Sequence, residues 1–198
     1  MIAEYDNEPI PGLPGFLPKD EEILWQGSPD WKRLAVNALH VRMIAVYFAL
    51  LAAFGAVQGS WNGALITLGV GLVCVIILGM IAWGTAKTTM YTLTNRRIVM
   101  RIGIALPKCI NLPLAQVAGA DLALASDGSG NVALTLAGSQ RLGWIALWPH
   151  ARPWRVTVPQ PMLRAIPQAA MVADLLARAT AAANTAAPAP APMLAVAA

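Results

Sequence analysis

The sequence contains few of the side chains that carry enzymatic chemistry. Its histidines and cysteines number two each, namely His40, His150, Cys74 and Cys109. Only three acidic residues follow position 30, namely Asp121, Asp127 and Asp174. We find no paired carboxylates, no Cys/His cluster with metal-ligand spacing and no glycine-rich phosphate loop. We therefore expect neither an enzyme nor a metal site. The two distant cysteines are expected to stay reduced, as in a cytoplasmic environment.

Charged side chains are absent from residues 43–86, a run of 44 residues. One pass through the hydrocarbon core of a bilayer needs roughly 20 apolar residues, so this run fits two helices and a turn. Residues 58–63, Gln-Gly-Ser-Trp-Asn-Gly, form a polar, turn-forming cluster inside it. The sequence predicts a two-helix transmembrane hairpin over residues 35–84. The alternative, a buried hairpin of a soluble protein, would place half of each uncharged helix in water.

The distribution of Lys and Arg predicts the orientation of this hairpin. Lys32, Arg33 and Arg42 precede it and Lys87 follows it, whereas the connecting turn carries no charge. Positively charged flanks stay on the cytoplasmic side of a membrane. We therefore expect a bacterial inner-membrane protein with two spans, both termini in the cytoplasm and the turn in the periplasm.

Small residues recur on the first predicted helix at Ala45, Ala49 and Ala53. Such a stripe lets another helix approach closely. Two uses of the stripe stay open, packing of the hairpin on itself and contact with a partner helix or a second copy of the chain. The second use underlies our expectation of a homodimer. Neither helix has an ionisable residue near its centre, which argues against a transporter or a proton relay.

Residues 1–34 form an acidic arm rich in proline, a composition that favours extended chain over helix. Its apolar residues Leu13, Phe16 and Leu17 fit either a partner or the chain's own later domain. Residues 20–24 are predicted to form a short helical turn. Asp30 is a predicted N-cap for the helix that follows.

After Lys87 the pattern changes to short, alternating segments that predict an antiparallel β-sandwich or open barrel over residues 85–180. Strands are predicted at residues 90–94, 98–102, 109–112, 117–125, 131–136, 142–147 and 154–158. A helix beginning at Pro167 is predicted to cap the sheets, because apolar residues recur there at helical spacing. Residues 181–198, rich in Ala and Pro, are predicted to form a flexible tail.

The sequence resembles known proteins at two levels, one segment matching a domain type and three further segments matching a family of whole proteins. The segment Tyr-Thr-Leu-Thr-Asn-Arg-Arg-Ile at residues 91–98 resembles the first hairpin of bacterial pleckstrin-homology (PH) domains, some of which follow a two-helix membrane hairpin. Residues 12–31, 40–48 and 152–167 resemble the photosynthetic reaction-centre assembly proteins of purple bacteria, the PuhB family. One departure is Asp20, where that family has glycine. The resemblance implies a non-enzymatic factor that helps reaction-centre subunits and core light-harvesting antenna polypeptides assemble. It assigns no contact residues.

Candidate binding residues come from residue chemistry alone. Trp and Arg dominate binding hot spots, so we predict partner contacts at Trp25, Trp31, Arg33 and Trp148. The alternative function is a membrane-tethered anionic-lipid sensor or scaffold, with Arg96, Arg97 and Arg101 as the candidate headgroup ligands. His40 is a weak candidate for ligation of a bacteriochlorophyll, because its place two residues before Arg42 puts it near the interface. No cofactor is expected, and nothing beyond net charge suggests nucleic acid.

Overall fold

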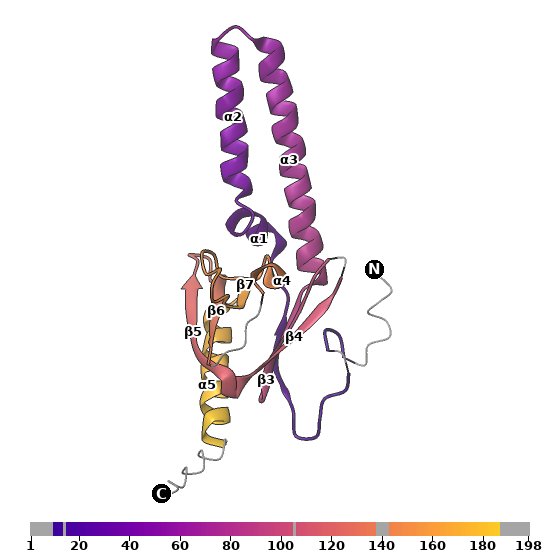
Figure 1. Ribbon diagram of the computed structural model, residues 1–198, viewed down its shortest axis with the longest axis vertical. Coiled ribbons are helices and arrows are strands. Elements are labelled where there is room, and N and C mark those ends of the chain that lie inside the picture. The colour runs from indigo at the N-terminus through magenta and orange to yellow at the C-terminus, as the bar shows by residue number, and fades with distance from the viewer. Residues whose placement is uncertain (1–9, 14, 105, 138–142, 187–198) are drawn as a thin grey trace, which may run out of the picture.

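The computed structural model describes residues 10–13, 15–104, 106–137 and 143–186. A helical hairpin stands on a domain of two antiparallel sheets (Figure 1). The chain enters through β1 (Ile23–Gly27) and α1 (Trp31–Asn37), then forms the hairpin of α2 (Val41–Val57) and α3 (Trp61–Thr88). It continues with β2 (Met90–Thr94), β3 (Arg97–Ile102), β4 (Lys108–Pro113) and a 3-10 turn, η2 (Leu114–Gln116). The remaining elements are β5 (Val117–Leu124), β6 (Gly130–Leu136), α4 (Trp144–Leu147), β7 (Met162–Ile166) and α5 (Ala169–Ala186).

The hairpin contains one helix that is long and apolar enough to span a membrane by itself. At 1.5 Å per residue, the 28 residues of α3 extend for about 42 Å, more than the roughly 30 Å of a hydrocarbon core. α2 has 17 residues and is long and apolar enough to be a candidate span only together with α1, from which it is bent by 55°. Within the described residues, the structure therefore shows one candidate span, and the second span of the predicted hairpin is not established by the fold.

The contact between α2 and α3 does not use the stripe of small residues on α2. Ala52 is buried in the contact between the helices, and a Cβ on Gly71 would lie 2.6 Å from the Cβ of Phe48. This close approach requires glycine. The stripe of Ala45, Ala49 and Ala53 is exposed instead. Of the two uses left open for this stripe, packing of the hairpin on itself is therefore not the one that the structure shows, because the three side chains are exposed.

The domain is a pair of antiparallel sheets with helices. One sheet has the order β1-β2-β3-β4 and the other β5-β6-β7. Their apolar faces meet in a common core that includes Tyr91, Met100, Leu134 and Ile166. α5 covers this core by packing on β5, β6 and η2, as predicted for the capping helix. Its first residue is Ala169, so Pro167 precedes the helix instead of starting it.

Three local predictions are wrong. Residues 23–27 form strand β1, not the end of a helical turn, because they pair with β2. Residues 144–147 form a turn of helix, α4, where a strand was expected. Residues 154–158 lie in an exposed loop despite their alternating apolar pattern, and the seventh strand is β7. All five residues of β7 are buried, so it lacks the alternation by which a half-buried strand is recognised.

The described part of the N-terminal arm belongs to the domain. Leu13 is 1 % exposed, and Gln26 Nε2 donates to the carbonyl oxygen of Pro11 at 2.6 Å. The arm therefore lies on its own chain, and the hairpin is inserted between two paired strands, β1 and β2. Asp20 has a φ of 64°, in the left-handed region that glycine adopts most easily. A glycine would therefore also fit this position.

Candidate functional site

The end of the domain nearest the hairpin is joined to it without a flexible linker. Thr89 caps α3 with a backbone hydrogen bond to Thr85, and β2 begins at the next residue. α1 packs against both α3 and β7, and the N–H of Asp30 donates to the carbonyl oxygen of Ala165 at 2.8 Å. Asp30 is also the N-cap of α1, as predicted, since its carboxylate accepts from the N–H of Lys32 at 2.8 Å. The hairpin and the domain are therefore held in one orientation.

A buried polar cluster stabilises this junction. The hydroxyl of Tyr91 lies 2.6 Å from His150 Nδ1, and Thr89 Oγ1 lies 3.2 Å from His150 Nε2. The backbone N–H of Arg164 donates to the Tyr91 oxygen at 3.2 Å, and its guanidinium donates to the carbonyl oxygen of Ala151 at 2.9 Å. The cluster connects the end of α3, both sheets and the segment after α4.

The electrostatics of the cluster keep His150 neutral. Its side chain is fully buried, and burial, together with the nearby positive charge of Arg164, lowers its pKa to about 3. Burial raises the pKa of Tyr91 above its usual value. When Nδ1 of the neutral imidazole accepts a hydrogen bond from the Tyr91 hydroxyl, the ring proton is on Nε2, which donates a hydrogen bond to Thr89 Oγ1. We assign this cluster a structural role, since a buried neutral histidine cannot meet a solvent-borne substrate.

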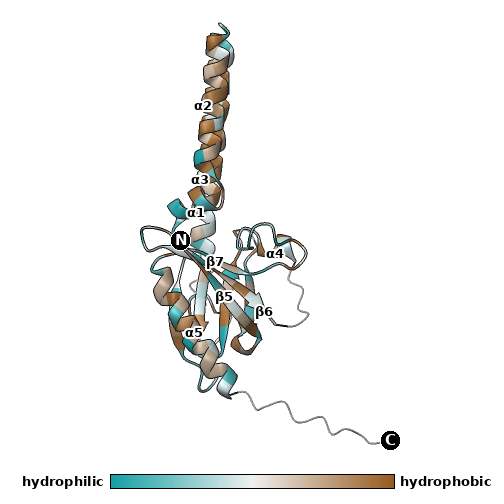
Figure 2. Ribbon diagram, turned by 90° about the vertical axis from the view of Figure 1, so that its left-hand side faces the viewer, coloured by the Kyte–Doolittle hydropathy of each residue, from teal (hydrophilic) through white to brown (hydrophobic). Residues whose placement is uncertain are grey.

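The predicted partner-contact residues fall into two groups. Trp31 is 42 % exposed, and the Lys32 ammonium lies 5.8 Å from the centre of its ring. Trp148 is 50 % exposed and directly follows α4, at the hairpin end of the domain (Figures 1 and 2). Arg33, on α1, forms an ion pair with Asp127 in the turn between β5 and β6. These three residues are at least partly exposed at the surface.

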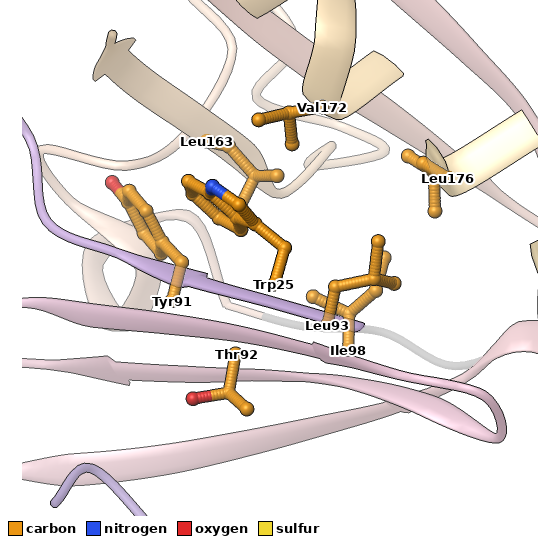
Figure 3. Close-up of a pocket in the computed structure, with 8 residues that line it drawn as sticks. All are labelled: Trp25, Tyr91, Thr92, Leu93, Ile98, Leu163, Val172 and Leu176. Atoms are coloured by element: carbon orange, nitrogen blue, oxygen red, sulfur yellow. The ribbon is translucent and has the colours of Figure 1, made fainter. Parts of the chain in front are cut away.

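Trp25 differs, because it packs toward the interior. Its ring lies between Tyr91 and the side chains of β7 and α5, including Leu163 and Val172 (Figure 3). The pocket drawn there has no volume open to a water molecule. The contacts of Trp25 therefore favour a packing role over a partner contact.

The geometry does not favour the predicted headgroup cluster of Arg96, Arg97 and Arg101. Arg97 is bound by both oxygens of Glu21, at 2.8 and 3.1 Å, and the Glu21 side chain is 2 % exposed. Arg101 is 4 % exposed. Arg96 lies in the β2–β3 turn, beyond the far end of β2, whose five residues extend for about 17 Å. That distance exceeds the screening length of about 8 Å at physiological salt.

His40 lies at the bend between α1 and α2, in the left-handed conformation with φ 52°. It is exposed, and it lines an open groove of about 800 Å³ whose other members are apolar, including Met43, Phe48 and Cys74. This position is at the end of the hairpin next to the domain. Ligation of a bacteriochlorophyll by His40 stays a disfavoured prediction.

Sequence reasoning missed the residues that the tertiary structure brings together at the junction. His150 and Tyr91 are 59 positions apart, and Arg164 and Tyr91 are 73 apart. No spacing rule joins such positions. Glu21 was also missed as the partner of Arg97, because it is one of three consecutive acidic residues and lies 76 positions from Arg97.

Both a protein family and an individual protein are similar to this chain. A family model described as "Bacterial PH domain" matches residues 42–180. A protein from Rhodobacter capsulatus is 37 % identical over 186 residues, which cover 89 % of this chain and 87 % of the relative. It is described as an uncharacterized 23.7 kDa protein in the puhA 5′ region. No solved structure gives a significant match.

Proposed function

The chain belongs to the bacterial PH domain family, and from this premise we propose that it is a membrane-anchored, non-enzymatic factor that assists assembly of the photosynthetic reaction centre. The matched relative is located beside the gene puhA, in agreement with the resemblance of this chain to reaction-centre assembly proteins. The proposed partners are nascent reaction-centre subunits and core antenna polypeptides.

We propose that both hairpin helices cross the inner membrane. The 17 residues of α2 are at the short end of the range for a spanning helix, and its large apolar residues, such as Met43, Leu50 and Phe54, are mostly exposed. Figure 2 shows that most residues along the hairpin are hydrophobic. In water an exposed apolar surface would be costly, whereas in lipid it is favourable. The flanking cations then place both termini in the cytoplasm.

Thiol labelling tests this topology. In a chain whose own Cys74 and Cys109 are replaced, a cysteine at Ser60 should react with an impermeant reagent from the periplasm. A cysteine at Ser126, in the exposed β5–β6 turn, should react only after permeabilisation. The reverse pattern, or labelling of both sites from one side, would contradict two spans.

The fixed connection between hairpin and domain carries the functional proposal. Because α3 continues into β2 and α1 packs between α3 and β7, the domain presents one end to the membrane surface. Exposed Trp31, Ile145 and Trp148 lie on the elements at that end. A subunit that is being inserted beside the hairpin would meet these side chains. We further propose that the outward stripe of small residues on α2 allows a second copy of the chain, or a partner helix, to pack there.

A pair of tryptophan variants tests the assembly role. Truncation of a hot-spot side chain costs about 2 kcal/mol, roughly thirtyfold in affinity. Trp148→Ala should therefore lower the yield of assembled reaction centres while the protein remains inserted and stable. Trp61→Ala is the matched control, because Trp61 is also exposed but lies at the far end of the hairpin.

Charge separation per assembled complex should stay normal in both variants. If deletion of the gene leaves the yield of complexes intact but lowers their turnover, the protein is a working component and the assembly role is wrong. A second candidate function, an anionic-lipid sensor or scaffold, is favoured by basic residues at the bend between α1 and α2.

A further inference from the structure

The bend between α1 and α2 creates a polar cleft of about 280 Å³, which we call the elbow cleft. The two helices meet at 55°, and the left-handed conformation of His40 makes the bend. The cleft is lined by Asp30, Lys32, Arg33, Val36, Asn37 and Arg42. Three of these six residues are cations, and one amide side chain adds hydrogen-bonding capacity. The cleft therefore has the chemistry of an anion site.

The acidic groups near the elbow cleft have other partners. The carboxylate of Asp30 accepts hydrogen bonds from the N–H groups of Lys32 and Arg33, at 2.8 and 3.3 Å. Asp127 is paired with Arg33. In the part of the chain that the structure describes, no carboxylate forms an ion pair with Lys32 or Arg42. Lys32, Arg33 and Arg42 together outnumber the one carboxylate that lines the cleft, Asp30, so the cleft keeps a net positive charge.

An apolar groove continues from the elbow cleft along α2. The groove, of about 390 Å³, is lined by Arg42, Met43, Val46, Tyr47 and Leu50. Arg42 thus borders both spaces. From Arg42 to Leu50 the helix rises about 12 Å, away from the domain and toward the hairpin tip. A ligand that fills both spaces needs an anionic end and a hydrocarbon end.

We propose that the elbow cleft and the adjoining groove bind one anionic phospholipid. Its phosphate lies between Lys32 and Arg42, and one acyl chain follows the groove over Val46 and Leu50. This assignment rests on the proposed placement of α2 in the bilayer. It does not depend on the role in assembly. The groove is what selects a lipid over free phosphate, because inorganic phosphate would use the cleft alone.

The test uses the full-length protein, purified in mild detergent, delipidated and titrated with phosphatidylglycerol, with bound lipid counted by native mass spectrometry. A cation near an anionic lipid contributes about 1 kcal/mol, equivalent to about fivefold in affinity. Arg42→Gln and Lys32→Gln should each weaken binding by about this factor. Arg96→Gln removes an equal charge at the far end of the domain and should change nothing.

A second pair of variants tests the groove. Leu50 and Leu65 are each 66 % exposed, but only Leu50 lines the groove. Leu50→Ser should weaken binding of phosphatidylglycerol and Leu65→Ser should not. Phosphatidylcholine, inorganic phosphate and glycerol phosphate should fail to displace the bound lipid.

Three results would overturn the proposal. Equal losses in Arg42→Gln and Arg96→Gln would show attraction by net charge only. Displacement by inorganic phosphate or glycerol phosphate would make the cleft a site for a soluble phosphate. Unchanged binding in both Lys32→Gln and Arg42→Gln would exclude the cleft. Failure of the assembly role would appear separately: deletion of the gene would leave the yield of reaction centres normal, while the purified protein would still bind the lipid.

Discussion

The buried state of His150 predicts that the domain loses stability in mild acid. A histidine whose pKa is lower in the folded than in the unfolded state binds its proton mainly after unfolding, so stability is full above the unfolded pKa and falls as the pH is lowered. The ordinary pKa is 6.5 and the folded value is about 3. The loss therefore begins near pH 6.5 and continues toward pH 3.

The magnitude follows from the width of that window. Each pH unit within it costs about 1.4 kcal/mol, so the change from pH 6.5 to pH 5 costs about 2 kcal/mol. This is a substantial share of the 5–15 kcal/mol that typically separates folded from unfolded domains. Protonation would also place a positive charge beside Arg164 and remove the acceptor for the Tyr91 hydroxyl.

Urea unfolding of the full-length protein at about pH 7 and about pH 5, followed by tryptophan fluorescence, measures this loss. His150→Gln should be less stable at neutral pH by about 1–3 kcal/mol, because the buried Tyr91 hydroxyl loses its best partner. Its stability should nevertheless fall about 2 kcal/mol less than that of the wild type between the two pH values.

The control is His40→Gln, since the sequence has two histidines and His40 is exposed. It should keep the pH dependence of the wild type. If His150→Gln and wild type lose the same stability in acid, the sensitivity arises from carboxylates and the neutral buried imidazole is refuted.

Two further predictions concern single contacts. Arg97→Ala should lower the free energy of unfolding by about 2 kcal/mol, because Glu21 would stay buried without its cation; this is below the 3–5 kcal/mol of fully buried pairs because Arg97 is partly exposed. Arg178→Ala, which removes an exposed i,i+4 pair, should change it by less than about 0.5 kcal/mol in the same urea titration. Ala52→Leu should lower the thermal stability of the hairpin in detergent, since Ala52 is buried against α3, whereas Ala49→Leu should leave the hairpin intact and alter only self-association measured by mass. Equal effects of the two leucine variants on the hairpin would contradict the packing described here.

Much of the fold could be predicted from the sequence, because the relevant forces act locally. The uncharged run predicted α2, α3 and the turn between them. Alternating side chains predicted β2 to β6, and helical spacing predicted α5. The Asp30 cap was also predictable, since a capping carboxylate needs only the N–H groups two or three residues ahead.

The remaining elements depend on contacts that are distant in sequence. β1 is a strand because β2 offers it hydrogen bonds, and its own residues do not alternate clearly. β7 is buried on both faces, which removes the periodic signal, and residues 154–158 have that signal but no sheet to pack on. Tertiary structure alone decided that Arg97 forms an ion pair with Glu21 and that His150 is buried beside Tyr91. It also decided that Lys32 and Arg42 line the same cleft. Local sequence sets which backbone conformations are favourable, whereas charge pairing and burial depend on which distant side chains exclude water together.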